Sequence, residues 1–201
     1  SFINNLSNLT EVVGGDITKI AEGMRLDKRI GEHAFLSAGV GYGGSCFPKD
    51  VKALIHTAKS NEVPFAILDE VEKVNYNQRK NLLKKIKTIL PKLKNAKIGI
   101  WGLAFKPKTD DVREAPALTV VNELLKAGAK LKAFDPVAED NFKSLVNSKN
   151  IQYCSNPFEA VKDNDLLVIM TDWNEFKEVD KNKLKGLLRV PNVVDGRNVY
   201  D

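Results

Sequence analysis

Cys46 lies in the stretch with the clearest chemical potential, GVGYGGSCFPKD over residues 39–50. It follows a run of glycines and precedes a predicted helix with a proline in its first turn. The unpaired N–H groups and the positive dipole end of a helix N-terminus favour a thiolate, and Lys49 adds a cation. Asp50, four residues after the cysteine, lies on the same helical face. This pattern is typical of a cysteine nucleophile with a carboxylate that assists proton transfer.

The alternative for Cys46 is burial as a small hydrophobe, which is the ordinary state of a cysteine. The glycines, the helix start and the two charged residues favour a functional role instead. Cys154 ends a predicted strand and has no charged neighbour in sequence, so we expect it in the core. His33 and His56 have no partner at metal-ligand spacing, and we predict no metal site.

A second group of cations, Lys106, Lys108 and Arg113, follows a predicted strand. At the C-terminal edge of a parallel sheet, such cations can bind phosphate oxygens. The glycines of this stretch do not form a GxGxxG motif. A solvated basic loop with Asp110 and Asp111 as counterions is therefore an equally good interpretation of the same residues.

Arg197, in DGRN at the end of the last predicted strand, projects from the same sheet edge as Lys106. An arginine there can fork onto a phosphate or sugar oxygen, although an exposed turn arginine is the alternative. The lysine-rich run over residues 79–97 interleaves its charges with apolar residues at helical spacing, and no aromatic stripe accompanies it. We therefore interpret the run as a solvated helix face and expect no nucleic-acid partner.

The first half of the chain, residues 1–95, reads as helical. Apolar spacing predicts a helix that ends at Gly14, and Asp16 caps a second short helix. A glycine-rich loop at 31–44 precedes the Cys46 helix, and a longer helix runs to Pro91. These elements must position the nucleophile.

In the second half, residues 96–201, the apolar residues no longer follow helical spacing throughout. A helix over residues 115–126 ends near Gly128. The predicted strands are residues 97–102, 131–134, 151–154, 166–170 and 192–195. Because strands alternate with helical patterns, we predict a Rossmann-like parallel sheet covered on both faces. The whole chain is therefore expected to be an α/β protein with a helical region followed by a Rossmann-like domain.

The composition narrows the class of protein. The chain has 201 residues, 43% apolar and 28% charged, which excludes collagen-like, disordered and disulfide-scaffold classes. No apolar run reaches the roughly 18 residues of a transmembrane helix, and the first residues are too polar for a signal peptide. The two cysteines occur in unrelated contexts, so we expect a cytoplasmic protein away from membranes. The net charge of +5 suits a nucleic-acid binder or an enzyme for anionic substrates.

Five motifs carry a resemblance to one enzyme family. GVGYGGSCFPKD closely resembles the active-site segment of the UDP-glucose/GDP-mannose dehydrogenase family. GLAFKPKTDDVREAP, at 102–116, resembles the signature that opens its C-terminal UDP-sugar-binding domain. FDP at 134–136, TDW at 171–173 and DGRN at 195–198 look like further landmarks in the expected order.

The resemblance implies roles for individual residues. Cys46 matches the catalytic nucleophile, and Asp50 matches the carboxylate that assists water and proton transfer. Lys49 and Arg113 match contacts to NAD. Arg29 looks like the arginine that reaches into a neighbouring subunit's sugar site. The other matches to the UDP-sugar site are Phe35, Leu36, Ser37, Ala38, Gly39, Tyr42, Gly43, Lys106 and Arg197.

The family reaction implied is a double oxidation of an alcohol to a carboxylate with two NAD, through a cysteine thiohemiacetal and a thioester. Phe47 favours UDP-glucose as the substrate, since GDP-mannose members tend to have leucine there and N-acetylmannosamine members tend to read GHC for GSC. The family also implies a homodimer formed through the helical region, and the product would feed polysaccharide biosynthesis. A dehydrogenase acting on GDP-mannose or UDP-N-acetylmannosamine stays open as an alternative.

The chain departs from the family pattern at its start. No GxGxxG strand-turn-helix is found, and the family's catalytic lysine and asparagine would precede the SFIN segment. We therefore expect a fragment that lacks the main NAD site and is inactive alone. A non-catalytic nucleotide-sugar-binding or dimerisation module is the second hypothesis, and a basic nucleic-acid binder is a third, disfavoured by the missing aromatic residues.

Overall fold

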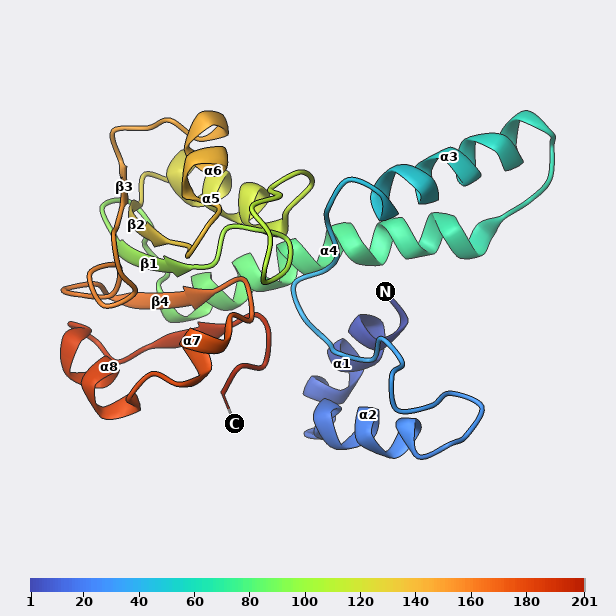
Figure 1. The fold of residues 1–201 in the computed structure, drawn as a ribbon, viewed down its shortest axis with the longest axis horizontal. Coiled ribbons are helices and arrows are strands. Elements are labelled where there is room, and N and C mark those ends of the chain that lie inside the picture. The colour runs from blue at the N-terminus through green and yellow to red at the C-terminus, as the bar shows by residue number, and fades with distance from the viewer. Residues whose placement is uncertain (201) are drawn as a thin grey trace.

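A computed structural model describes residues 1–200 of the chain. We call residues 1–95 the helical half and residues 96–200 the α/β half. In chain order the elements are α1 (Phe2–Val12), α2 (Ile17–Arg25), α3 (Phe47–Ser60), α4 (Ala66–Ile89), β1 (Lys97–Trp101), α5 (Pro116–Lys126), β2 (Lys130–Phe134), α6 (Glu139–Leu145), β3 (Ile151–Tyr153), β4 (Leu166–Ile169), α7 (Asn174–Lys177), α8 (Lys181–Leu187) and β5 (Val193–Asp195). Figure 1 shows that α4, the last helix of the helical half, extends against the α/β half.

The predicted boundaries of the first helices are confirmed. Asp16 caps α2, because its carboxylate accepts hydrogen bonds from the backbone N–H groups of Thr18 and Lys19, at 2.8 and 3.3 Å. A proline in the first turn of α3 and the proline after α4 also lie where the sequence predicts them. The residues between α2 and α3 form the expected loop.

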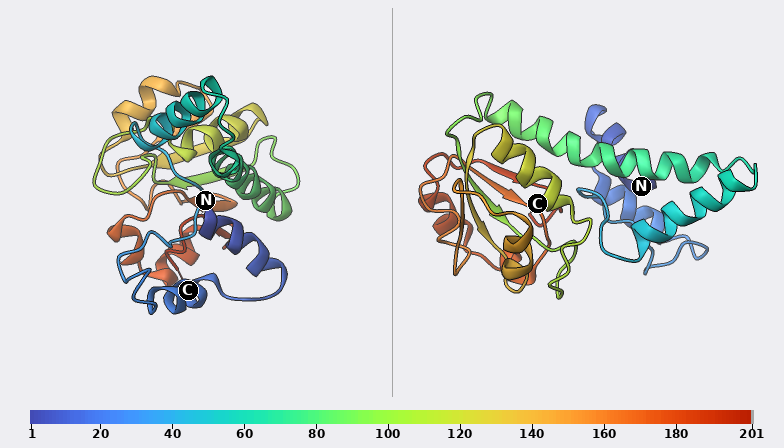
Figure 2. Two further views of the ribbon diagram at one scale, coloured as in Figure 1. Left: turned by 90° about the vertical axis from the view of Figure 1, so that its right-hand side faces the viewer. Right: turned by 90° about the horizontal axis from the view of Figure 1, so that it is seen from above.

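The long helix α4 connects the two halves. It packs against α1 and α3 in the helical half and against α5 and β5 in the α/β half, and Figure 2 shows α3 alongside its first turns. Its inward face changes character along its length: Asn75 and Gln78 are buried polar residues, whereas Leu82 and Ile86 are buried apolar residues of the sheet core. The buried face of α4 thus contributes amide side chains to the helical half and aliphatic side chains to the core of the α/β half.

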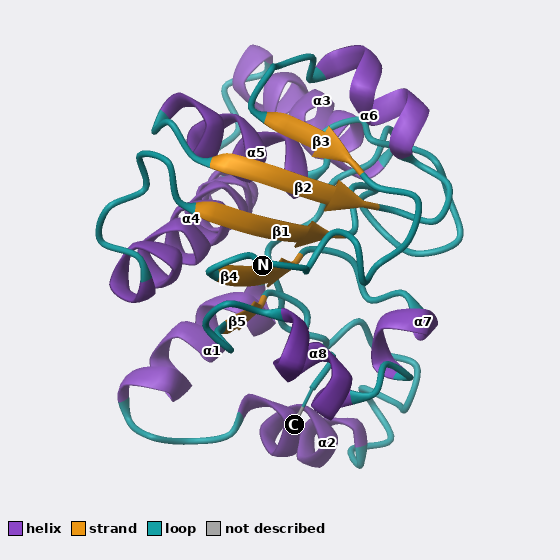
Figure 3. Cartoon of the chain, turned by 90° about the vertical axis from the view of Figure 1, so that its left-hand side faces the viewer, coloured by secondary structure: helices purple, strands orange, loops and turns teal. Residues whose placement is uncertain are grey.

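The sheet is entirely parallel, with strand order β3-β2-β1-β4-β5 (Figure 3). This is the order of a Rossmann-like fold, in which the direction of winding reverses between β1 and β4. Ile98 and Ile100 of β1 face one core cluster with α4, α5 and α6, while Trp101 faces the other with α7 and α8. Both faces of the sheet are covered, as the alternation of strands and helices predicts.

Three short helices were not predicted from the sequence. α6, α7 and α8 span seven, four and seven residues, so few turns exist to display a helical period. Each buries one apolar side chain against the sheet: Phe142, Phe176 and Leu184 respectively. β3 ends at Tyr153, one residue earlier than predicted.

Within residues 1–200, none of the helices combines enough length with enough apolar character to cross a membrane. Likewise, no cluster of histidine, cysteine, aspartate or glutamate side chains in this part of the chain could hold a metal ion.

Candidate functional site

Cys46 immediately precedes α3 and is exposed, as a nucleophile must be. Its carbonyl accepts a hydrogen bond from the Asp50 N–H at 2.9 Å, which begins the helix. Its Sγ lies 3.6 Å from the Ser45 hydroxyl oxygen. The Asp50 carboxylate is one turn away and pairs with the Lys49 ammonium at 3.3 Å. The structure therefore places the predicted nucleophile at a helix start, while its predicted carboxylate partner points to a cation.

A cleft of about 530 Å³ lies beside the glycine-rich loop. It brings six of the predicted sugar-site residues together with the first residue of α3. Its lining is Ser1, Ile3, Asn4, Phe35, Ser37, Gly39, Gly41, Tyr42, Gly43, Phe47, Phe105 and Arg197. The cleft thus draws on α1, the loop at 31–44, the start of α3 and two loops of the α/β half.

Side-chain amides from two helices hold the backbone of the loop. The Gly39 N–H donates to the Asn4 Oδ1 at 2.8 Å, and the Gly39 carbonyl accepts from the Gln78 Nε2 at 3.1 Å. Asn75 accepts from the Tyr42 N–H at 2.7 Å and donates to the Tyr42 carbonyl at 3.2 Å. Each of these two loop residues therefore has both of its backbone polar groups satisfied by amides, as buried backbone requires.

Two glycines allow this close approach. Gly41 has a φ of +100°, and a Cβ built there would lie 2.4 Å from the Asn75 Oδ1. A Cβ on Gly43 would lie 2.4 Å from the Glu114 carbonyl oxygen of the α/β half. Any larger residue would push the loop away from both of its supports.

Tyr42 is fixed by polar and aromatic contacts. Its hydroxyl donates to the Glu72 carboxylate, and its ring meets the Phe47 ring edge-on at a centroid distance of 4.7 Å. Burial, followed by the hydrogen bond to Glu72, raises the pKa of the Tyr42 phenol. The phenol therefore stays protonated at neutral pH and acts as a donor.

Arg197 lies where the winding of the sheet reverses. Its Nε donates to the Met170 carbonyl after β4 at 2.9 Å, and its Nη2 donates to the Phe105 carbonyl after β1 at 3.0 Å. A Cβ on Gly39 would lie 3.3 Å from its Nη1, so the guanidinium borders the loop. Burial lowers the pKa of Arg197, and the nearby Asp172 carboxylate opposes that shift. The arginine thus links two strand ends to the cleft.

Lys106 follows β1 at the same sheet edge, as predicted, but remains exposed. Its Nζ lies 5.3 Å from the centroid of the Phe105 ring, which lines the cleft. Unlike Arg197, whose guanidinium bonds to two backbone carbonyls, Lys106 keeps its ammonium at the surface next to the cleft.

Lys49 and Arg113, the residues matched to NAD contacts, share a second recess next to Cys46. This basic hollow contains Lys49, Lys52, Arg79 and Arg113, and Gly44, Ser45, Glu114, Ala115, Leu118, Thr119 and Leu145 complete its lining. Two hydrogen bonds of 2.9 Å join the Arg113 side chain to the Asp111 carboxylate, and they lower the pKa of that carboxyl. The same pair, with a smaller contribution from Cys46, raises the pKa of Arg113.

The remaining predicted residues lie outside the cleft. Leu36 and Ala38 line an adjoining recess with α2 and Tyr200, and Ala38 packs with Ile3 of α1. Arg29 is exposed in the loop after α2, where its guanidinium pairs with Asp27 at 2.6 Å. In the described residues of this single chain, Arg29 therefore does not reach the cleft.

A buried carboxylate that sequence reasoning did not select organises the sheet edge. Asp135 accepts from the backbone N–H groups of Leu103 and Ala104 at 2.7 and 3.2 Å, and from those of Val137 and Ala138 at 3.0 and 2.9 Å. It also accepts from the indole N–H of Trp173 at 3.3 Å. Its place in the FDP motif, directly after β2, is the signal that could have revealed it.

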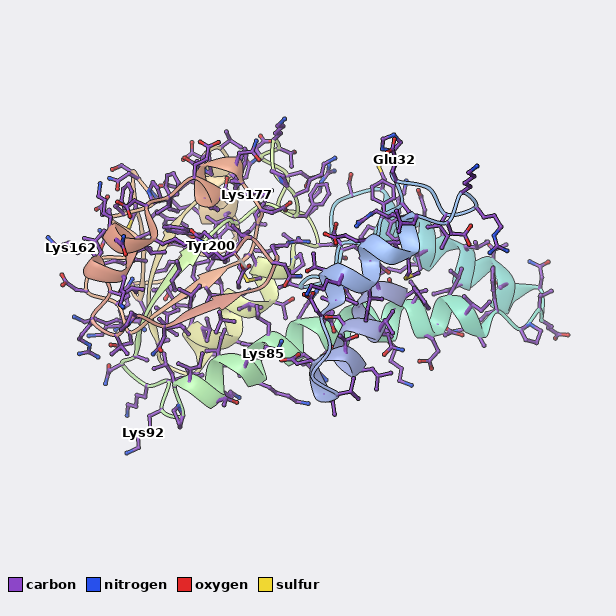
Figure 4. The ribbon with its side chains drawn as sticks, turned by 90° about the horizontal axis from the view of Figure 1, so that it is seen from below. Glu32, Lys85, Lys92, Lys162, Lys177 and Tyr200 are labelled. Atoms are coloured by element: carbon purple, nitrogen blue, oxygen red, sulfur yellow. The ribbon has the colours of Figure 1, made fainter. Side chains whose placement is uncertain are left out.

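The amide residues on α1 and α4 were missed for a different reason. Asn4, Asn75 and Gln78 stand at helical spacing among apolar residues, but nothing local distinguishes them from solvent-facing polar residues. Figure 4 shows two surface charges of the two halves that lie far apart, Lys162 of the α/β half and Glu32 of the helical half.

Comparisons with known proteins place this geometry in context. Residues 1–77 match the central domain of the UDP-glucose/GDP-mannose dehydrogenase family, and residues 99–201 match its UDP binding domain. The chain is 44% identical over 200 residues to UDP-glucose 6-dehydrogenase TuaD of Bacillus subtilis, covering all of the chain and 43% of that protein. It is 40% identical over 201 residues to UDP-glucose 6-dehydrogenase of Rhizobium meliloti, covering all of the chain and 45% of that protein.

Solved structures give the same relationship. A UDP-glucose dehydrogenase from Pyrobaculum islandicum superposes with a TM-score of 0.90 at 34% identity, covering 98% of this chain and 44% of that one. A UDP-D-ManNAc dehydrogenase from Pyrococcus horikoshii superposes with a TM-score of 0.83 at 25% identity, covering 100% of this chain and 44% of that one. The chain therefore spans less than half the length of the relatives described here.

Proposed function

Since the chain belongs to the UDP-glucose/GDP-mannose dehydrogenase family, we propose that the protein carrying it oxidises UDP-glucose to UDP-glucuronate with NAD as the hydride acceptor. The observation that carries this proposal is the cleft where the glycine-rich loop, Arg197 and the start of the Cys46 helix meet. Because the chain covers less than half of its relatives, the activity is proposed for the whole protein.

UDP-glucose is favoured over other nucleotide sugars by two observations. The relatives that are 40 and 44% identical are both named UDP-glucose 6-dehydrogenase, whereas the UDP-D-ManNAc dehydrogenase is 25% identical. Phe47, which the family resemblance associates with UDP-glucose, lines the cleft and packs edge-on against Tyr42. A change at Phe47 would therefore alter the wall that faces the sugar.

Arg197 and Lys106 would bind the diphosphate of the substrate from one sheet edge. The Nη1 of Arg197 borders Gly39 at the cleft, and Lys106 is exposed with its ammonium beside the Phe105 ring. Cations at the reversal point of a parallel sheet are well placed for a dianionic diphosphate. This anionic substrate would account for the net charge of +5 without nucleic acid.

The cofactor NAD would accept a hydride in each of the two oxidations. Lys49 and Arg113 would hold it, because both line the basic hollow directly beside Ser45 and Cys46. Lys52 lies in the same hollow and adds a third cation, while the Arg79 guanidinium there is bonded to protein acceptors. A cationic recess next to the nucleophile fits a negatively charged dinucleotide.

Cys46 would act in the second oxidation. Its thiolate adds to the aldehyde carbon and forms a C–S bond, giving a thiohemiacetal. Loss of a hydride from that carbon and of a proton from the hydroxyl gives a thioester. Water then attacks the thioester carbon, the C–S bond breaks, and the thiol and the carboxylate are released. Asp50, one turn from Cys46, would take a proton from the attacking water.

The test uses the full-length natural protein with UDP-glucose and NAD. We expect two NADH for each UDP-glucuronate, and steady turnover that Cys46→Ser lowers by at least about a thousandfold, because a protonated hydroxyl is a far weaker nucleophile. The variant should accumulate aldehyde or a covalent sugar adduct, visible by intact-protein mass. Cys154→Ser is the matched control, since Cys154 is buried away from the cleft and its loss should leave turnover intact. Near-normal turnover by Cys46→Ser would refute the nucleophile role.

A nucleotide-sugar-binding module without turnover is the second candidate function, favoured by the cleft where loop backbone and the Arg197 guanidinium meet. Calorimetric titration of this chain with UDP-glucose, GDP-mannose and UDP-N-acetylmannosamine would identify the base and sugar that it prefers. Binding of UDP-glucose without turnover by the full-length protein would favour the module over the enzyme.

We also propose a cytoplasmic homodimer that forms through the helical half. Apolar side chains there lie exposed at Phe2, Leu9, Val12 and Val13, which are 59–83% accessible. Such a patch on a small helical layer is typical of a protein interface. Sedimentation of the full-length protein tests this proposal, and a monomer at micromolar concentration would contradict it.

A further inference from the structure

Arg79 on α4 makes contacts in three directions. Its Nη2 donates to the Tyr42 carbonyl at 3.3 Å and to the Glu114 carbonyl at 3.2 Å. Its Nη1 donates to the Thr119 hydroxyl on α5 at 3.2 Å. The first acceptor belongs to the glycine-rich loop of the helical half, and the other two belong to the α/β half.

The two backbone acceptors lie on opposite sides of the candidate site. Tyr42 lines the cleft assigned to the sugar, and Glu114 directly follows Arg113 in the basic hollow. A second bond crosses the same junction, since the Gly44 N–H donates to the Arg113 carbonyl at 2.8 Å. Cys46 follows Gly44 by two residues. The junction therefore sets where the nucleophile lies relative to the basic hollow.

We propose that Arg79 is a positioning residue that fixes the Cys46 segment against the Arg113 loop, and that it acts on the chemical steps more than on substrate binding. The inference rests on the proposed function, because it concerns the distance between the nucleophile and the cofactor side of that site. Arg79 lines the hollow but acts through the two loops it joins.

The chemistry of the contacts requires an arginine. A planar guanidinium spreads its donors over acceptors in different directions, whereas a lysine ammonium is a compact point charge on a flexible stem. The Nε of Arg79 is buried without a hydrogen-bond partner, so the side chain is placed by its two terminal nitrogens. Burial lowers the pKa of Arg79, while Glu114 and then Glu72 oppose that shift.

The sugar side of the loop has its own support. Asn4 and Gln78 hold Gly39, and Asn75 holds Tyr42, all without Arg79. Losing Arg79 should therefore leave the cleft wall in place while the segment from Gly43 to Cys46 loosens. This separation predicts a lower kcat with little change in the KM for UDP-glucose.

The kinetic arm uses Arg79→Lys in the full-length natural protein. We expect kcat to fall about tenfold or more, the effect of one charge-assisted hydrogen bond, while the KM for UDP-glucose stays within about twofold. Lys80→Met is the matched control, because it removes an exposed cation from the next position of α4, where its ammonium contacts the Tyr76 ring. Asn75→Ala, which breaks the sugar-side support, should instead raise KM. An unchanged kcat, or an Arg79→Lys KM that rises as much as that of Asn75→Ala, would overturn the proposal.

The second arm is amide hydrogen exchange on the full-length natural protein, a measurement that needs no activity. In Arg79→Lys the Gly44 N–H should exchange at least about tenfold faster, whereas the Gly39 N–H, bound to Asn4, should change less than about twofold. Equal acceleration at both amides would mean general loosening and would overturn the inference. If the full-length wild type fails to oxidise UDP-glucose, the proposed function fails, and the exchange result still decides whether Arg79 joins the loops.

Discussion

The two halves of the molecule are stabilised in different ways. The α/β half has two large apolar clusters, one on each face of its sheet, and every side chain of β4 is fully buried. The helical half has a cluster of only three buried residues, Ile3, Ala21 and Ala38. Its glycine-rich loop is held by amide side chains and by Val40, which is buried in one of the large clusters. The comparison teaches that polar contacts position the residues of the site, whereas buried apolar side chains stabilise the sheet that supports it.

The clearest test of this comparison is one substitution made in each core. Ile98→Ala, in the fully buried centre of β1, should cost about 4–5 kcal/mol of unfolding free energy, because the packed sheet cannot close the cavity. Ile3→Ala should cost about 2 kcal/mol or less, since its small cluster can collapse around the missing atoms. Urea unfolding of both variants measures the difference. Equal costs would mean that the helical half is packed as tightly as the sheet.

The second prediction separates binding from packing within the α/β half. Lys106→Met should weaken the binding of UDP about tenfold or more, because one charge-assisted contact to the diphosphate is lost while the core is untouched. Lys108→Met is the matched control, an exposed lysine of the same loop. Calorimetric titration of both variants with UDP gives the comparison. If the two variants lose the same affinity, the loop attracts UDP through its overall positive charge, and Lys106 makes no specific contact to the diphosphate.

The smallest expected effect uses the two cysteines, one from each half. Burial, then the Glu159 carboxylate, raises the pKa of the Cys154 thiol to about 11. Because the unfolded thiol titrates near 8.5, the folded state binds the proton more tightly. The resulting stability is fully present below pH 8 and is lost as the pH rises toward 11, by about 1 kcal/mol at pH 9.

Unfolding at several pH values checks this sign. Cys154→Ala should flatten the decline in stability between pH 8 and pH 10, because it removes the thiol that is buried, whereas Cys46 is exposed. The same contrast predicts that iodoacetamide labels Cys46 before Cys154 at neutral pH. Labelling of Cys154 first in the folded protein would contradict its burial.

Much of the fold followed from local patterns. The five strands appeared as short apolar runs, the end of α1 at a glycine pair, and the start of α2 at a capping aspartate. Repeating patterns need several residues to be visible, and α6, α7 and α8 are too short to provide them. The exposed Cys46 at a helix start also followed from its neighbours, because a proline and a glycine run mark the same boundary.

What the sequence by itself determined is the set of elements and the chemistry at their ends: a cysteine at a helix N-terminus and cations after parallel strands. Only the tertiary structure decided which polar residues support them. Asn75 binds a loop residue 33 positions away, Arg197 binds a carbonyl 92 positions away, and Asn198 binds the Ala38 carbonyl 160 positions away. The physical reason is that a hydrogen bond depends on where two groups meet in space, and a local pattern carries no information about a partner so distant in the chain.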